Sequence, residues 1–454
     1  MEEPTKEEST APAGARNPSH LFGGVDSISS LPDEILHHIL SFVPTNVAIT
    51  TSVLSKRWRH VWCKTPYLSF TNINASIESI HETLASYTAP KIMGLHLYVD
   101  SESFEEASER SNHVDSLVKF AISHNVEKLS LVLKDYYVFS DFFFSNPSLK
   151  QLIVDSRNKM SPKCTVSWTS LQTLSLRNCL LDESFAKVLS GSPVLETLTL
   201  RSCSISCLDL SESRRIRRLD IEFTNSSPKK CHIVAPHIHY LRLIDFRQKC
   251  TLGDVSSLTE ADIDSIYFVP RFWCIQVDLE DPSKDLDYQV MMQTMLEKLQ
   301  NVENLTVGLS FLQMLSIAEF RGVPFPTLKV KTLTLKTTII RSAVPGIAKL
   351  LQHSPELKKI FFYKTEDWNC AEKYVNRCLD PQDPQDLIFP AKSAFKVAKP
   401  DLVASFIELL LLNTRTLETL VLQLRSCLNT SNYDELSQIA LTLSRKNKVS
   451  IVLK

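Results

Sequence analysis

The chain has 454 residues, enough for roughly two to four ordinary domains or for one long repeat array. Lysine and arginine number 50 and aspartate and glutamate 51, and this formal net charge of −1 does not favour nucleic acid or an anionic membrane as the main partner. Only nine glycines are present, and no two have the close spacing of a dinucleotide fingerprint or a phosphate-binding loop, which argues against a nucleotide-dependent enzyme.

The cysteine content and the N-terminus indicate where the protein resides. Eleven cysteines spread over so long a chain do not resemble a secreted disulfide framework, so we expect reduced thiols. Residues 1–25 are polar and lack the apolar core of a secretory signal, and we expect a disordered leader. No apolar run approaches the roughly 20 residues that span a bilayer. We therefore expect a soluble protein of the cytoplasm, the nucleus or both, with no membrane partner.

The segment after the leader predicts a small helical head. Ser30 is placed to cap a helix, Pro32 suits its first turn and Pro44 ends it. Between the two prolines, apolar residues recur at helical spacing: Ile35, Leu36, Ile39, Leu40 and Val43. Two further short helices fit residues 45–53 and residues 56–62. Residues 26–70 thus predict a three-helix domain.

This head carries more large apolar side chains than three short helices bury among themselves, because about 40 residues rarely sustain a core of their own. Two interpretations follow. The head docks on the rest of the chain as a cap, or its amphipathic helices dock on another protein.

The motifs LPDEIL, LSFVPT and SVLSKRWRHVW, in this order and spacing, resemble an F-box of the plant type. In that family the segment binds a Skp-type adaptor and so recruits a cullin–RING ubiquitin ligase. The resemblance implies these adaptor-contacting residues: Leu31, Pro32, Ile35, Ile39, Ser52, Leu54 and Trp58. Ser27 and Asn46–Val47 depart from the usual pattern outside the apolar stripe, and we expect them to affect which adaptor is preferred.

Beyond the head, residues 90–365 predict a leucine-rich-repeat solenoid. The repeated unit is an apolar residue, two others, an apolar residue, one other and an apolar residue. Units begin at Ile92, Val126, Leu149, Leu171, Leu195, Ile216, Ile238 and Ile263, and less regularly at Val302, Val330, Leu357 and Leu417. The steps from Val126 to Ile263 are 21 to 25 residues, which matches leucine-rich repeats. Because such units stack side by side, we expect an α/β fold with a parallel concave sheet.

Two segments, LSGSPVLETLTL and LLQHSPELKKIFF, strengthen the resemblance to plant F-box/leucine-rich-repeat proteins. Residues 366–454 resemble the FBD-like tail that follows such arrays, although the expected tryptophan-containing strand is missing. Within this tail, Asp380–Pro390 contains three prolines and predicts a loop.

Signals for catalysis or metal binding are weak. Cys203 with Cys207, Cys231 with His232, and the neighbouring residues 37–38 are the nearest metal-ligand candidates, and none has a matching second pair. The cysteines that end two repeat units are expected to be small buried groups. No hydrolase elbow, zinc-protease helix or kinase signature occurs. We expect no catalytic residue, no metal, no cofactor and no enzyme activity of the chain itself.

Residues between the repeat leucines are expected on the open face of the solenoid, where such proteins bind partners. The candidates for target binding are Arg177, Arg201, Arg218, Tyr240 and Arg242. The arginines would form a basic strip for an acidic or phosphorylated ligand. The alternative, which we favour, is a solvated face with ordinary ion pairs.

Together these features predict the substrate-recognition subunit of an SCF-type cullin–RING ubiquitin ligase. The head would bind a Skp-family adaptor, and through it cullin and RING subunits, while the repeats hold a target protein that the sequence does not identify. One alternative is a repeat scaffold whose head only caps the solenoid, with no ligase role. Another is a degenerate receptor that binds the adaptor and no target.

Overall fold

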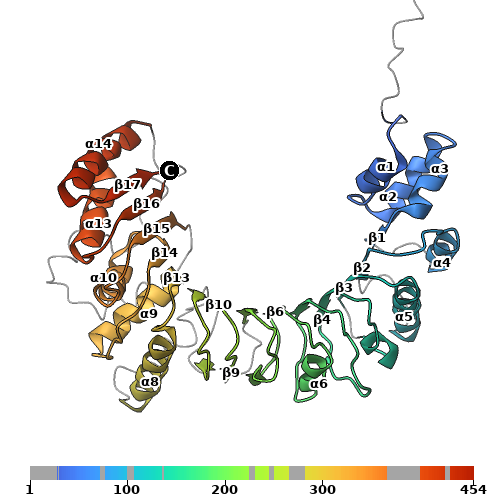
Figure 1. Ribbon diagram of the computed structural model, residues 1–454, viewed down its shortest axis with the longest axis horizontal. Helices are drawn as coiled ribbons and strands as arrows, with labels where there is room; N and C mark the ends of the chain where they lie inside the picture. The colour runs from blue at the N-terminus through green and yellow to red at the C-terminus, as the bar shows by residue number, and fades with distance from the viewer. Residues whose placement is uncertain are drawn as a thin grey trace, which may run out of the picture.

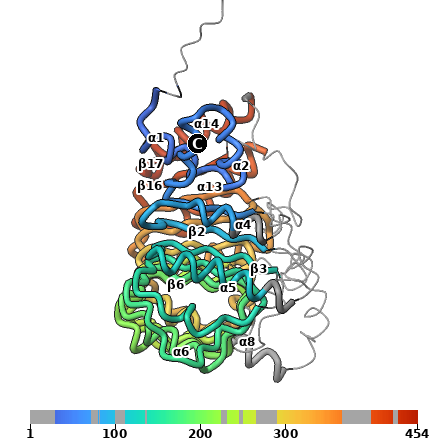
Figure 2. Tube along the Cα trace, turned by 90° about the vertical axis from the view of Figure 1, so that its right-hand side faces the viewer, coloured from blue at the N-terminus to red at the C-terminus, as the bar shows by residue number. Residues whose placement is uncertain are grey.

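The computed structural model describes residues 28, 30–71, 77–99, 107–134, 137–223, 231–244, 250–264, 282–365, 399–424 and 430–454. These parts form an arch whose inner face is lined by strands and whose outer face carries helices (Figure 1). A view turned by 90° shows the turns of the chain stacked one behind another (Figure 2). The predicted α/β class, with N-terminal helices and a parallel concave sheet, is confirmed. The expected leader lies outside the described residues.

The head consists of short helices divided by prolines, as the sequence predicts. Its elements are α1 (Asp33–Leu40), α2 (Thr45–Thr50) with the 3-10 turn η1 (Thr51–Val53), and α3 (Trp58–Val61) with the 3-10 turn η2 (Trp62–Lys64). Pro32, and not Ser30, occupies the N-cap of α1, and Pro44 occupies that of α2. Proline fits here because the first turn of a helix leaves its N–H groups unpaired anyway.

One parallel sheet of fourteen strands runs through the described part of the chain. In spatial order its strands are β1 (Tyr67–Phe70), β2 (Gly94–Val99), β3 (Lys128–Leu133), β4 (Gln151–Ser156), β5 (Thr173–Arg177), β6 (Thr197–Arg201), β8 (Arg218–Glu222), β10 (Tyr240–Ile244), β12 (Glu260–Asp264), β13 (Asn304–Gly308), β14 (Thr332–Thr337), β15 (Lys359–Lys364), β16 (Thr419–Gln423) and β17 (Ser450–Leu453). A second, three-stranded parallel sheet contains β7 (Cys207–Asp209), β9 (Cys231–Val234) and β11 (Cys250–Leu252).

The repeat leucines form continuous ladders across the main sheet. Leu152, Leu174, Leu198, Leu219 and Leu241 stand in register on five neighbouring strands, and all are fully buried. Burial of one such side chain contributes about 1.5–3 kcal/mol. No single repeat can bury its own leucines on both sides, so stacking is what stabilises each unit.

The predicted unit at Ile263 is wrong in its register. Leu258 begins the unit, Ala261 pairs with Leu241 and Ile263 pairs with Leu243. The small Ala261 side chain hides the pattern, because an alanine is a weak signal where a leucine is expected. The other predicted units each begin two residues before a strand.

Helices cover the outer side of the arch (Figure 1). They are α4 (Ile77–Ala85), α5 (Ala107–Ser123), α6 (Phe185–Ser190), α8 (Pro282–Leu299), α9 (Leu309–Phe320), α10 (Val344–Gln352), α13 (Pro400–Leu412) and α14 (Thr430–Asn447), with the 3-10 turns η4 (Asp141–Phe144) and η5 (Arg341–Ala343). In the C-terminal region the strands β16 and β17 extend the same sheet. The loop expected at Asp380–Pro390 lies outside the described residues, and the FBD-like identity of the tail stays a prediction.

The head and the solenoid have separate hydrophobic cores that meet at a polar joint. Thr45 Oγ1 accepts a hydrogen bond from the Ser69 N–H of β1 at 2.8 Å. The Tyr87 hydroxyl donates to the Thr65 carbonyl at 3.0 Å. The Cys63 carbonyl accepts the N–H groups of residues 88 and 89, at 2.9 and 3.2 Å. The head is therefore held at the first edge of the sheet without sharing its core.

Candidate adaptor-binding and target-binding surfaces

Helix α1 carries two apolar stripes that meet different surroundings. Leu36 and Leu40 are buried, at 0% and 3% exposure, in the head core. One position earlier in each turn, Ile35 and Ile39 are 45% and 42% exposed, and Phe42, two residues past the end of α1, is 75% exposed. The four-residue spacing of Ile35 and Ile39 places them on one side of the helix. One stripe holds the head together, and the other is left in contact with solvent.

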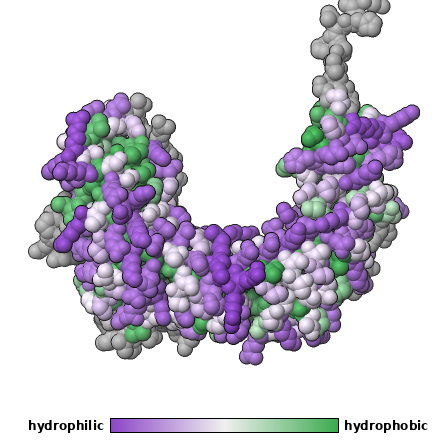
Figure 3. All heavy atoms as spheres, in the orientation of Figure 1, coloured by the Kyte–Doolittle hydropathy of each residue, from purple (hydrophilic) through white to green (hydrophobic). Residues whose placement is uncertain are grey.

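The segments before and after α1 add further exposed apolar side chains. Ile28, Val47, Val53 and Leu54 are 56%, 44%, 87% and 66% exposed. We call these four, together with Ile35, Ile39 and Phe42, the exposed head residues. Figure 3 shows hydrophobic residues on the head, above the hydrophilic inner part of the same arm. So much exposed aliphatic and aromatic surface on a small unit is typical of an interaction site.

The structure divides the residues predicted to contact the adaptor into three groups. Ile35, Ile39 and Leu54 are exposed apolar side chains, and Pro32 is exposed beside them. Leu31 and Ser52 are half-buried. Trp58 differs from the rest: it is only 5% exposed and belongs to the head core, so little of its side chain is available for the predicted adaptor contact.

Four exposed head residues escaped the sequence prediction: Ile28, Phe42, Val47 and Val53. For Phe42 a signal was present, because it continues the stripe of Ile35 and Ile39 by three residues. Val53 also had a signal, since it follows Ile49 by four residues in the helix expected at 45–53, whereas Ile28 and Val47 had none.

Arg57 fixes the start of α1 against the third helix. Its Nη2 lies 2.6 Å from Asp33 Oδ1, and the same atom donates to the Leu31 carbonyl at 2.5 Å. The hydrogen bond from this guanidinium lowers the pKa of the Asp33 carboxyl below its usual value. Both side chains are partly exposed, so the pair contributes to geometry more than to stability. Its effect is to hold Leu31 and Pro32 in place beside the exposed head residues.

The candidate target-binding residues lie on the inner face of the sheet but in different rows. Arg177 aligns with Arg201, Arg218 aligns with Tyr240, and Arg242 lies in a third row. The Arg218 guanidinium stacks on the Tyr240 ring, 3.6 Å from its centroid. The four arginines therefore do not make one continuous line.

Acidic side chains stand between these arginines. Arg242 Nη1 lies 3.0 Å from Asp220 Oδ1, and its Nε lies 3.9 Å from an Asp262 oxygen. Arg201 lies 3.8 Å from Asp220, and Arg177 lies 3.9 Å from Asp155. The centre of the inner face is thus an alternating network of ion pairs, which agrees with the interpretation favoured from the sequence and not with a basic strip.

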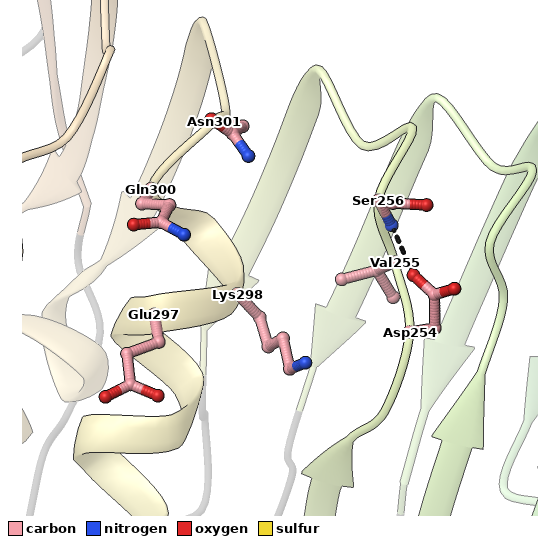
Figure 4. A pocket seen from close by; sticks show the side chains of 7 residues that line it. All are labelled: Asp254, Val255, Ser256, Glu297, Lys298, Gln300 and Asn301. Carbon is pink, nitrogen blue, oxygen red and sulfur yellow. Dashed lines mark hydrogen bonds between the residues drawn. The ribbon is translucent and has the colours of Figure 1, made fainter.

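A pocket of about 510 Å³ opens between the turn after β11 and the end of α8 (Figure 4). Its lining residues are Asp254, Val255, Ser256, Glu297, Lys298, Gln300 and Asn301. The Asp254 carboxylate accepts the Ser256 N–H at 3.0 Å, a local turn contact. We assign no chemistry to this pocket.

Metal-ligand side chains are not gathered together anywhere in the described ranges: no three of histidine, cysteine, aspartate and glutamate are placed to hold an ion. Cys179 and Cys203 are 0% and 3% exposed, which agrees with their expected role as small buried groups. Over the same ranges, none of the helices has the length and apolar character needed to cross a membrane.

Comparison with known proteins gives the same two-part division. Residues 28–69 match the family described as F-box domain, and residues 90–341 match the family described as At1g61320/AtMIF1, LRR domain. A putative F-box/LRR-repeat protein of Arabidopsis thaliana is 52% identical over 448 aligned residues, covering 95% of this chain and 94% of that protein. A second from the same plant is 49% identical over 453 residues, covering 95% of both chains, and a third is 42% identical over 473 residues, covering 98% of both.

The helical head, the parallel repeat sheet and these full-length similarities agree, and the resemblance read from the sequence is confirmed. This chain belongs to the plant F-box/LRR-repeat protein family.

Proposed function

We propose that this chain is the substrate-recognition subunit of an SCF-type cullin–RING ubiquitin ligase. In this role the head binds a Skp-family adaptor, which connects it to the cullin and RING subunits, and the repeat solenoid holds a target protein. The observation that carries the proposal is the set of exposed head residues, led by Ile35, Ile39 and Phe42.

The exposed head residues favour a separate partner over the solenoid-cap alternative. The head is joined to the sheet through Thr45, Cys63 and Thr65, and Ile35, Ile39 and Phe42 keep 42–75% of their surface exposed after that contact is made. Covering one such side chain is worth about 1.5–3 kcal/mol, so several of them provide a sizeable part of a binding free energy. A head that served only as a cap would place these residues against the solenoid.

The mechanism that follows is proximity, with no reaction step assigned to this chain. A conjugating enzyme bound to the RING subunit would carry out the transfer, and the solenoid would raise the local concentration of target lysines near it. No cofactor or metal is required for this role. We place the protein in the cytoplasm, the nucleus or both, where such ligases meet their targets.

The test is binding of the full chain to a purified plant Skp-type adaptor. We expect Ile39→Asp to weaken binding by at least about tenfold, because a charge at the centre of an apolar interface is costly to desolvate. Val138→Asp is the matched control, since Val138 is 63% exposed and lies between β3 and η4, outside the head. An unchanged dissociation constant for Ile39→Asp, or no binding by the wild-type chain, would contradict the proposal and favour the scaffold alternative.

A further inference from the structure

The inner face of the last four strands differs in composition from the centre of the sheet, where charged residues form ion pairs. Residues that point to the inner face of β14–β17 alternate with the buried ladder, and they run from Thr332 to Val452. Four of them are large and apolar: Phe361, Tyr363, Val421 and Val452. We call these four the C-terminal inner patch.

Strand register brings the patch residues together. Phe361 pairs with Val421, which pairs with Val452, so three apolar side chains stand side by side on neighbouring strands. Tyr363 follows Phe361 on the same face, two residues along β15. Tyr363 is 39% and Val452 is 37% exposed, while Phe361 and Val421 are half-buried. Figure 3 shows hydrophobic residues on this arm of the arch and a hydrophilic strip at the middle of its base.

The charged residues at inner-face positions of β14–β17 are both lysines. Lys359 is exposed on the patch side of β15, and Lys336 stands in register with Tyr363 on β14. No acidic residue occupies an inner-face position of β14–β17 in the portion of the chain that the structure describes. Lys336 is already paired, since its ammonium lies 3.0 Å from a carboxylate oxygen of Asp262 on β12.

The central part of the inner face is less suited to a partner. Arg242 already contacts Asp220, Glu222 and Asp262, so a ligand there must displace or desolvate existing ion pairs. At the C-terminal inner patch, a ligand instead covers apolar surface and meets a lysine positive charge. Aromatic and branched side chains at the centre of an interface are the usual source of binding free energy.

We propose that the C-terminal inner patch binds an extended segment of a partner protein in which an aromatic or branched aliphatic side chain stands beside acidic residues. The apolar side chain lies on Phe361, Val421 and Val452, and a neighbouring carboxylate meets Lys359. The assignment of this partner as a ligase target rests on the proposed function. The patch lies on the arm of the arch opposite the head (Figure 1), so a bound segment faces the end where the adaptor would sit.

The test uses two fluorescein-labelled decapeptides, one with glutamates flanking a central phenylalanine–valine pair and one with lysines in place of the glutamates. Fluorescence anisotropy with the full chain is expected to show at least about tenfold tighter binding of the acidic peptide. The double variant Tyr363→Ser/Val452→Ser is expected to weaken that binding by about tenfold or more. The matched control is Tyr98→Ser/Val132→Ser, which removes the same side-chain types from the inner face of the opposite arm.

Equal affinity for the two peptides, no binding of the acidic peptide, or an equal loss in the control variant would overturn the inference. Adaptor binding measured on the same preparations separates the two proposals. If the adaptor binds but the peptides and variants do not show the expected differences in affinity, only the proposed role of the C-terminal inner patch is contradicted. If the peptides behave as expected and the adaptor does not bind, the patch stands and the ligase role falls.

Discussion

Single residues of the head show how burial divides apolar side chains of similar character between two tasks. Trp58 packs with Leu36 and Leu40 in the head core, whereas Ile39 on the same three-helix unit keeps 42% of its surface exposed. Sequence resemblance assigned Trp58 and Ile39 the same role, because a motif records which residues recur and not which way they point. Packing separates them into a residue that supports the head and a residue that is free to bind.

The first prediction concerns Trp58. Trp58→Ala should destabilise the head by about 3–5 kcal/mol, because it leaves a large cavity in a small core. Limited proteolysis should then cleave residues 31–64 much faster than in the wild type. Val53→Ala is the control, since Val53 is 87% exposed and should change stability by less than about 0.5 kcal/mol. Equal proteolysis of the two variants would show that Trp58 does not hold the head together.

The second prediction concerns Glu127, which joins the units before and after it. Its carboxylate contacts the Lys91 ammonium and lies 3.1 Å from that of Lys150. Hydrogen bonds from Lys91 and then Lys150 lower the pKa of Glu127. Stabilisation from a lowered pKa is complete above the unfolded-state pKa of about 4.3 and is lost as the pH falls through the folded-state pKa. The lysines are half exposed, so screening limits the effect to about 1 kcal/mol.

Glu127→Gln should accordingly lower the urea midpoint at pH 7 and have progressively less effect as the pH is lowered below about 4. Urea unfolding at several pH values measures this. The control is Glu418→Gln, whose exposed pair with Lys358 should contribute little at any pH. If Glu127→Gln lowered the urea midpoint by the same amount at every pH, the loss of stability would come from packing and not from the charge.

At the scale of elements, the close contact between α9 and α10 depends on one glycine. A Cβ atom at Gly346 would lie 2.1 Å from the Leu312 carbonyl oxygen, and the Gly346 N–H donates to Ser316 Oγ at 2.9 Å. The two helices therefore touch backbone to backbone. A larger residue at this position would force them apart.

The third prediction is that Gly346→Ala lowers stability by about 1–3 kcal/mol through overpacking. Glycine-to-alanine changes in a helix normally raise stability by about 1 kcal/mol. A loss of stability in Gly346→Ala would therefore indicate overpacking between the two helices. Thermal unfolding measures it, with Ala348→Ser on a half-exposed position of the same helix as the control. A more stable Gly346→Ala protein would contradict the close helix contact.

Elements also show what the sequence predicts and where it falls short. The ladder strands were predictable because leucines at every second position along a strand, all of them buried, leave a periodic signal in the sequence. The register of β12 was not predictable, because Ala261 stands where the pattern expects a leucine. Strands β1 and β17 were not predictable either, because four residues are too few to show a period. The repeat pattern places Phe361 and Tyr363 on the open face, but it does not show that Val421 and Val452 stand beside Phe361, because only the strand register brings them together.

At the scale of the whole molecule, the arch places the head and the C-terminal repeats at its two ends (Figure 1). The head has its own core and meets the sheet through a few hydrogen bonds, such as that from the Ser69 N–H to Thr45 Oγ1. Few glycines are needed in this architecture: Asn178 and Ser202, with φ of 59° and 56°, make the left-handed turns after β5 and β6. The low glycine content is thus compatible with a long coil of strands and helices.

The fourth prediction follows from the separate cores. Deleting residues 1–64 should leave the solenoid folded, with a thermal midpoint lowered by no more than a few degrees, because the buried ladders are untouched. Circular dichroism and calorimetry measure this against the full chain. Aggregation, or loss of the main transition, would show that the head stabilises the array as a cap.

The most direct test of the account is hydrogen–deuterium exchange of the full chain with and without a Skp-type adaptor. If the head binds the adaptor, we expect slower exchange in peptides covering residues 31–64 when the adaptor is present. We expect unchanged exchange in the strands of the arch from Lys128 to Ile263. Exchange that slows in those strands but not in the head would contradict an adaptor site on the head. So would unchanged exchange throughout the chain at saturating adaptor.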